Sequence, residues 1–310
     1  MPTEQRVLTT PDGRRLEVLT AGPAGGLPLL FHNGTPSGLV AFEPMTAAAA
    51  ERGLRTVMYA RPGYGQSAPR PGRSVADTVG DAASVLDDLG AGQFVTVGWS
   101  GGGPHALACA ARLPGRCLAA ASLAGVAPAQ AAGLDWLAGM GPENIEEFGA
   151  ARRGEAALTA YLTPEAEQLG QVTGEQVAAA LGDLVSAADR EVITAGFADY
   201  LAAAFRAALS TGIAGWLEDD LAFVTGWGFP VEQAGQVPVA VWQGSEDRMV
   251  PAAHGAWLAG HIPGARAHLL DGEGHLTVAI RGFGAVLDDL LDLASPAGRP
   301  AGPGTRPTAG

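Results

Sequence analysis

The sequence predicts an α/β fold in which a mostly parallel central sheet has helices on both faces and is interrupted by an inserted helical segment. Short apolar runs alternate with helix-length segments up to about residue 123, which is the pattern of βαβ units. The strand runs then stop for about a hundred residues and resume at Val237. We therefore expect a core domain in two parts, residues 1–127 and 233–294, with a helical cap between them at 128–232.

The first expected element is a β-hairpin. Asp12-Gly13 supplies the positive φ angles that a tight turn needs between strands at Val7–Thr9 and Leu16–Thr20. Four further strands are expected in apolar runs, at Leu27–Phe31, Leu54–Tyr59, Phe94–Val97 and Leu118–Leu123. Helices are expected between them, at about Phe42–Arg52, Val75–Leu89 and Gly102–Leu113.

The segment after Val126 has helical periodicity instead. Apolar residues recur at i, i+4, i+7 and i+8 in two places, namely Val177, Leu181, Leu184 and Val185, and Ile193, Phe197, Tyr200 and Leu201. The sheet pattern then returns with strands at Val237–Trp242 and Ala267–Leu270 and helices near Ala252–Gly260 and Thr277–Leu293. Such an insertion is typical of a lid over the carboxyl edge of a parallel sheet. Residues 295–310, with four Pro and four Gly, predict a disordered tail.

Composition excludes several classes of function. All 19 basic residues are Arg, and the absence of Lys excludes pyridoxal Schiff bases, Lys nucleophiles and a P-loop. A net charge of -13 has the wrong sign for binding nucleic acid or an anionic membrane surface. Cys109 and Cys117 lack disulfide or zinc spacing and are interpreted as core residues. No signal peptide and no apolar run of membrane-spanning length is recognisable, which predicts a cytoplasmic protein.

The strongest local motif is Gly98-Trp99-Ser100-Gly101-Gly102, a G-x-S-x-G sequence between an expected strand and an expected helix. In that context the serine lies on a strained strand-to-helix turn that exposes its hydroxyl for attack. The flanking positions must be glycine, because a Cβ would collide with the adjoining strand or helix. Ser100 is therefore the candidate nucleophile.

A serine nucleophile needs a histidine base, and that histidine needs a carboxylate to orient it. Asp247 lies in the loop after the expected strand at Val237–Trp242, and His275 lies in the loop after the next strand. The intervening residues accommodate one helix and one strand, which places both side chains on the same edge of the sheet. Glu246 is the alternative acid, but the offset from Gly244 favours Asp247.

Ser100, Asp247 and His275, in this chain order, resemble the catalytic triad of the α/β-hydrolase fold family. The resemblance extends from the opening hairpin to the last helix and implies an α/β-hydrolase fold with an inserted helical cap. It also implies an oxyanion hole made by the backbone N–H groups of Thr35 and Gly101. Residues 61–67, Arg-Pro-Gly-Tyr-Gly-Gln-Ser, resemble the glycine-rich turn of the family.

The chain departs from the family pattern at two places. Asn33-Gly34 stands where the family commonly has His-Gly, and Ala60 stands where an aspartate often precedes the glycine-rich turn. Neither departure affects the three candidate catalytic residues. A serine in the nucleophile position argues against the haloalkane dehalogenase and epoxide hydrolase branches, which attack through a carboxylate.

Such a site predicts acyl transfer through a covalent acyl-enzyme, and we expect a carboxylic ester hydrolase acting on small or medium-sized, mostly apolar substrates. The same residues also serve amide, lactone or carbon-carbon bond hydrolysis, lyase chemistry, or a ligand-binding protein without activity. The sequence has no dinucleotide-binding motif and no ligand-spaced His, Asp and Glu cluster, so neither a cofactor nor a metal is expected. The expected partner is a small-molecule substrate, and the oligomeric state is left open.

Substrate contacts are expected from both the core and the insertion. The candidates are Trp99, Asn33, Trp136, Tyr200 and Trp216. Between Pro128 and Pro230 the chain has 15 acidic residues and four Arg, and the run Glu218-Asp219-Asp220 comes shortly before the return to the sheet. A negative cap of this kind predicts weaker hydrolysis of anionic substrates.

Overall fold

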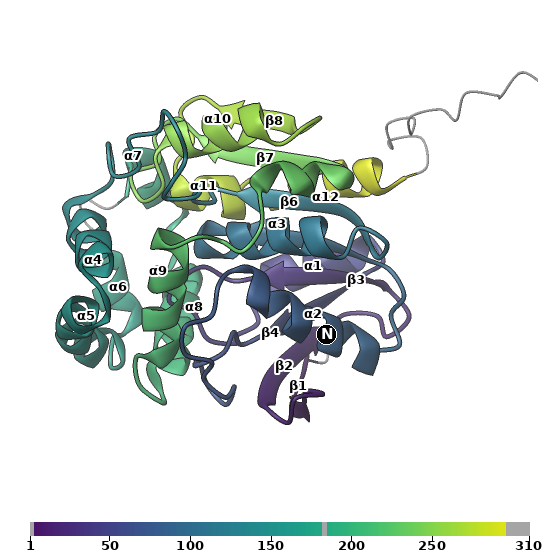
Figure 1. Cartoon of the computed structure of the whole chain (residues 1–310), viewed down its shortest axis with the longest axis horizontal. Coiled ribbons are helices and arrows are strands. Elements are labelled where there is room, and N and C mark those ends of the chain that lie inside the picture. Colours follow the sequence, from purple (N-terminus) through teal and green to yellow (C-terminus); the bar gives the residue numbers. More distant parts are fainter. Residues whose placement is uncertain (1–2, 182–184, 296–310) are drawn as a thin grey trace, which may run out of the picture.

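An eight-stranded sheet forms the centre of this computed structural model, which describes residues 3–181 and 185–295 (Figure 1). Its strand order is β1-β2-β4-β3-β5-β6-β7-β8. The strands are β1 (Thr3–Thr9), β2 (Arg15–Ala21), β3 (Leu27–His32), β4 (Leu54–Tyr59), β5 (Phe94–Trp99), β6 (Cys117–Leu123), β7 (Val239–Gly244) and β8 (Arg266–Leu270). Apart from Ser295, the tail expected at 295–310 lies outside the described residues.

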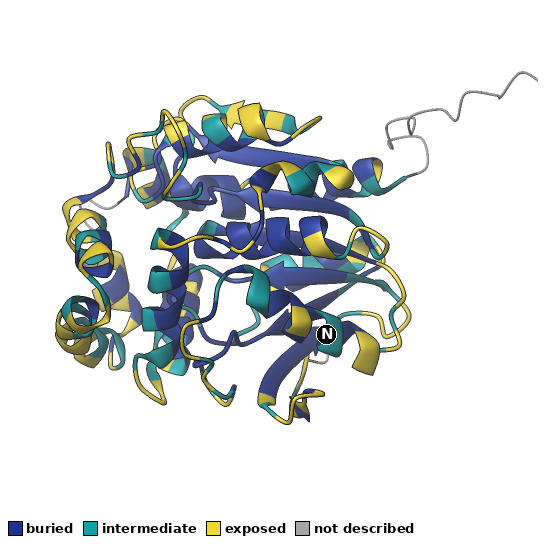
Figure 2. Ribbon diagram, viewed as in Figure 1, coloured by how far each residue is buried: buried dark blue, intermediate teal, exposed yellow. Residues whose placement is uncertain are grey.

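The sheet is mostly parallel, as the alternating apolar runs predict. Only β2 pairs antiparallel with its neighbours β1 and β4, while β3 to β8 all run parallel. Side chains along β3 alternate between the two faces, so Leu29 and Phe31 pack in one apolar core and Leu30 packs in the other. The central strands are dark blue along their length in Figure 2, which shows that they are buried on both faces.

Helices cover both faces of the sheet. On one face lie α1 (Glu43–Glu51) and α12 (Phe283–Ala294), and on the other lie α2 (Val79–Asp88), α3 (Gly103–Arg112) and α10 (Ala252–His261). The short helix α11 (His275–Ile280) follows β8. The described part of the core also contains 3₁₀ segments at η1 (Ala76–Thr78), η2 (Ser100–Gly102) and η4 (Val231–Gln236).

Six helices in the described ranges lie between β6 and β7 in the chain, and we call them the inserted helices. They are α4 (Pro142–Arg153), α5 (Glu155–Leu169), α6 (Gly174–Ala180), α7 (Ala187–Val192), α8 (Ala195–Leu209) and α9 (Ala214–Val224). In Figure 1 they gather at the left, beyond the carboxyl ends of the parallel strands. Within the described ranges, none of the helices is long and apolar enough to cross a membrane.

Three helices differ from the sequence prediction. The helical periodicity at Val177, Leu181, Leu184 and Val185 extends beyond α6, which ends at Ala180, and Leu184 lies outside the described residues. The single helix expected at Thr277–Leu293 is divided into α11 and α12, because the chain turns at Gly282 before α12 begins. Ile193, expected within a helix, ends α7, and α8 starts only after Thr194. The Thr194 hydroxyl accepts the N–H of Phe197 at 3.3 Å, so this residue caps α8. The apolar periodicity continues across these helix ends, so it does not show where each helix stops.

Candidate active site

Ser100 lies on a strained turn between β5 and α3. Its φ is 55°, in the left-handed region that is costly for a residue with a side chain. A Cβ on Gly98 would lie 2.1 Å from the carbonyl oxygen of Gly102, and one on Gly102 would lie 2.0 Å from that of His32. Glycine is therefore required at both positions, as the motif predicts.

The turn lies where the order of strands in the sheet reverses. From β3 the chain passes to β4 on one side, and it then returns to β5 on the other side of β3. The loops that follow β3 and β5 thus diverge at the carboxyl edge of the sheet, the usual ligand site of an open α/β fold. Thr35 lies in the first of these loops and Ser100 begins the second.

Asp247 and His275 meet at the same edge. The Nδ1 atom of His275 lies 2.9 Å from Oδ2 of Asp247. The other oxygen of Asp247 accepts the backbone N–H groups of Met249 at 2.9 Å and Val250 at 2.8 Å. Glu246, the alternative acid, is exposed to solvent. The structure therefore pairs His275 with Asp247.

The protonation of His275 depends on opposing effects. Burial lowers the pKa of its imidazole. The nearby Asp247 carboxylate and its hydrogen bond raise that pKa by a larger amount, so the pKa of His275 is raised overall. The Trp99 indole lies beside the imidazole, with ring centroids 5.8 Å apart, and its N–H donates to the carbonyl oxygen of His275 at 3.3 Å. The ring is thus held on two sides.

Ser100 and His275 line one cavity of about 90 Å³. Thr35 also lines it, while α8 of the inserted helices contributes apolar side chains that include Tyr200 and Phe205. Apolar lining with a few polar groups is the common character of small-molecule sites.

The loop after β3 is held by a buried arginine. Arg61 donates to the carbonyl oxygens of Asn33 at 2.7 Å and Gly34 at 2.9 Å, and to the Thr35 hydroxyl at 3.0 Å. A Cβ on Gly101 would lie 2.4 Å from that hydroxyl oxygen, so the two predicted oxyanion-hole residues are in close contact. Two of these bonds hold the backbone of the loop, and the third holds the Thr35 side chain.

Arg61 is balanced by Asp219, a fully buried carboxylate of α9. Arg61 donates to Asp219 through Nη2 at 2.5 Å and Nε at 3.0 Å, and the buried Arg73 forms a second ion pair with the same carboxylate. The hydroxyls of Thr35 and Tyr64 also donate to it, at 2.8 and 3.0 Å. Burial raises the pKa of Asp219, but the two arginines lower it well below its usual value.

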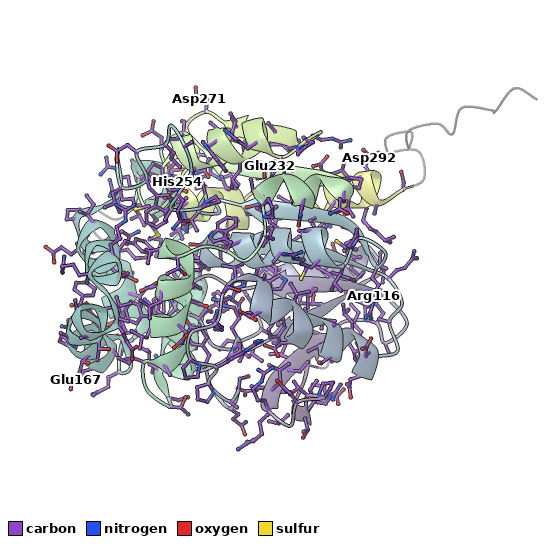
Figure 3. All side chains as sticks on the ribbon, in the orientation of Figure 1. Arg116, Glu167, Glu232, His254, Asp271 and Asp292 are labelled. Atoms are coloured by element: carbon purple, nitrogen blue, oxygen red, sulfur yellow. The ribbon has the colours of Figure 1, made fainter. Side chains whose placement is uncertain are left out.

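The acidic run Glu218–Asp220 does not line the cavity. Asp219 is neutralised by arginines, and Asp220 is also fully buried. Burial and the charge of Glu147 raise the pKa of Asp220 well above its usual value. Solvated acidic residues such as Glu167 on α5 point outward from the inserted helices (Figure 3). The run therefore contributes little of the negative field expected at the mouth of the cavity.

Two of the five predicted substrate contacts, Trp99 and Tyr200, line the cavity. The other three do not. Trp136 is buried and donates its indole N–H to the carbonyl oxygen of Ala127 at 2.6 Å, and Trp216 donates to Glu147 at 2.7 Å. The Asn33 amide donates to the carbonyl oxygen of Gly38 at 3.4 Å. Each of these three side chains is instead used for packing or local hydrogen bonding.

The sequence prediction missed Arg61, Arg73 and Asp219. One signal was available, because successive residues of an α-helix are about 100° apart around its axis. Three consecutive acidic residues therefore span about 200°, too wide for one solvated face of a packed helix. This pattern predicts that at least one of residues 218–220 is buried and paired with a basic side chain.

Residues 28–279 match the alpha/beta hydrolase fold family. A non-heme chloroperoxidase of Streptomyces lividans is 30% identical over 146 residues, which are 46% of this chain and 53% of that protein. The aligned part thus spans about half the length of that relative.

Many solved structures resemble this chain over almost its whole length. A carboxylesterase structure from Nitrososphaera gargenis superposes with a TM-score of 0.67 at 19% identity, covering 93% of this chain and 98% of its own. Epoxide hydrolase A from Mycobacterium thermoresistibile superposes with a TM-score of 0.65 at 22% identity, covering 96% and 99%. These likenesses show a common fold, and the match over residues 28–279 shows that the chain belongs to the α/β-hydrolase fold family.

Proposed function

We propose that the protein is a serine hydrolase that cleaves a carboxylic ester. The observation that carries the proposal is the shared cavity of Ser100 and His275, with Asp247 bound to the far side of the imidazole. Nδ1 of His275 is engaged by Asp247, which leaves Nε2 as the nitrogen that exchanges a proton with Ser100. The roles are Ser100 as nucleophile, His275 as base and Asp247 as the group that orients it.

In the first half of the reaction the Ser100 oxygen attacks the ester carbonyl carbon while His275 takes the hydroxyl proton. The N–H groups of Thr35 and Gly101 stabilise the oxyanion of the tetrahedral intermediate. Its collapse breaks the carbon–oxygen bond to the alcohol, which leaves with the proton from His275. In the second half, His275 removes a proton from water, whose oxygen attacks the acyl carbon. The bond from that carbon to the Ser100 oxygen then breaks, His275 gives the proton to this oxygen, and the acid is released.

The inserted helices act as a cap over this site in the proposed enzyme. Tyr200, Leu201 and Phe205 of α8 line the same cavity as Ser100. An apolar cavity of about 90 Å³ favours small or medium-sized, mostly apolar esters.

Covalent labelling combined with product analysis tests this proposal. A fluorophosphonate should label Ser100, and an ester panel should release alcohol and acid from the same preparation. Release from amides, lactones or diketones in preference to esters would assign one of the other hydrolytic reactions. Turnover without an acyl-enzyme would indicate a lyase, while neither labelling nor turnover would indicate a ligand-binding protein.

The assignment of the acid predicts unequal effects at two adjacent residues. Replacing the buried carboxylate in Asp247→Asn removes the group that fixes the tautomer of His275, and kcat should fall by roughly 10⁴-fold. Glu246→Gln alters an exposed side chain and should change kcat less than twofold. Steady-state kinetics of the two variants on one ester provides the measurement. A larger loss in Glu246→Gln would move the assignment to that residue.

A further inference from the structure

The carboxylate of Asp189 contacts the helix that begins at His275. Asp189 lies in α7, within the inserted helices, and is fully buried. Its Oδ2 accepts the backbone N–H of His275 at 3.0 Å. Its Oδ1 accepts those of Leu276 at 2.7 Å and Thr277 at 3.0 Å. One side chain, 86 residues before His275 in the chain, thus binds the first three N–H groups of α11.

Residues of both α7 and the turn before α11 shape the contact between Asp189 and α11. Gly274 precedes α11 and has no side chain that could cap it, so the acceptor comes from Asp189. A Cβ on Gly274 would lie 2.3 Å from Oδ2 of Asp189 and 2.4 Å from Oγ of Ser186. Asp189 is held in turn by Ser186, whose hydroxyl accepts the N–H of Asp189 at 3.1 Å. A shift of either Asp189 or Gly274 would therefore disturb the position of the other.

The same carboxylate adds negative charge near the imidazole. The charged groups that act on His275 are Asp247, from the loop after β7, and Asp189, from α7. Both raise the pKa of His275 against the effect of burial. Arg281 is exposed and is paired with Glu191 at 3.0 Å and Glu273 at 3.3 Å. A protonated His275, which forms during acyl transfer, is therefore stabilised by both carboxylates, through the ring for Asp247 and from the backbone side for Asp189.

We propose that Asp189 is a positioning residue for His275, acting through the backbone of α11 and through its charge on the protonated ring. The proposal rests on the proposed function, because it assigns Asp189 a part in proton transfer to and from Ser100. The inserted helices would then contribute to the reaction in two ways, because α8 lines the cavity and α7 positions the catalytic histidine.

The test compares Asp189→Asn with the matched control Glu191→Gln. The Asn side chain keeps its shape and one acceptor oxygen but loses the charge, so fluorophosphonate labelling of Ser100 should slow by roughly ten- to a hundredfold. The His275 resonance, followed by NMR, should titrate at lower pH than in wild type. Glu191 lies on the same helix, but its ion pair with Arg281 is exposed. Its variant should match wild type in both measurements.

A purely structural role would lower the melting temperature of Asp189→Asn but leave labelling and titration unchanged, and this result would overturn the proposal. If Asp189→Asn does not fold, Gly274→Ala disturbs the same contact from α11 and should give the same two changes. If wild type is not labelled, the proposed function fails. The titration of His275 needs no turnover and still decides the role of Asp189, since an unchanged value in the variant contradicts it.

Discussion

Ser100→Ala is expected to reduce kcat on any ester substrate by roughly 10⁴- to 10⁶-fold and to abolish covalent labelling by a fluorophosphonate. The proposed reaction passes through a bond from the Ser100 oxygen to the acyl carbon, and alanine has no atom that can form it. Stability should change little, because the side chain is half-buried at the cavity and φ stays in the left-handed region in both proteins. Kinetics on purified, folded variant and mass spectrometry of the labelled protein provide the measurements.

Ser84→Ala is the matched control for this substitution. Ser84 lies on α2 and donates its hydroxyl to the carbonyl oxygen of Gly80 within the same helix, away from the cavity. Its variant should be labelled at the wild-type rate. Undiminished turnover in Ser100→Ala, with Ser84→Ala also active, would show that another residue carries the reaction.

Local signals predict most of the fold. The hairpin turn, the alternation of apolar runs and the two glycines beside Ser100 each depend on a few neighbouring residues. In the turn, Gly13 has the expected positive φ, at 85°, but Asp12 does not. The order Ser100, Asp247 and His275 could be read because each residue follows a strand, and parallel strands end at one edge of a sheet. Topology therefore brought together residues that are far apart in the chain.

Contacts that depend on the packing of the inserted helices could not be predicted from local sequence patterns. Arg61 and Asp219 are 158 residues apart, and no local pattern links them. Trp136 and Trp216 have the composition of substrate contacts, yet their indole N–H groups are used inside the fold. Which face of an inserted helix meets the cavity depends on the rotation of that helix, and periodicity does not specify it when the helix is buried on several sides.

The largest expected effect on stability comes from Asp219→Asn. This substitution removes the carboxylate that faces Arg61 and Arg73 and leaves two guanidinium groups buried without their partner. Breaking a buried ion pair from one side costs about 3–5 kcal/mol of unfolding free energy. The loop that carries Thr35 loses a hydrogen-bond acceptor as well, so kcat should also fall. Urea unfolding and ester kinetics measure the two effects.

The sign of the pH dependence follows from the lowered pKa of Asp219. The folded state keeps this carboxylate ionised, so its contribution is present above the unfolded pKa of about 3.9 and is lost as pH falls below it. The difference in unfolding free energy between wild type and Asp219→Asn should therefore be full at neutral pH and shrink in acid. A difference that is constant with pH would mean that shape, and not charge, is lost in the variant.

Asp220→Asn, at the next residue, should have the opposite effect. Burial and the charge of Glu147 raise the pKa of Asp220, so the folded state holds a proton that the unfolded chain releases above a pH of about 3.9. The unfolding free energy of wild type then falls by up to about 1.4 kcal/mol per pH unit as pH rises between the unfolded and folded pKa values. Asparagine has no proton to hold, and Asp220→Asn should equal or exceed wild type in stability at neutral pH. If both variants lose similar free energy there, then Asp220 is ionised in the folded protein and the two aspartates do not differ in charge.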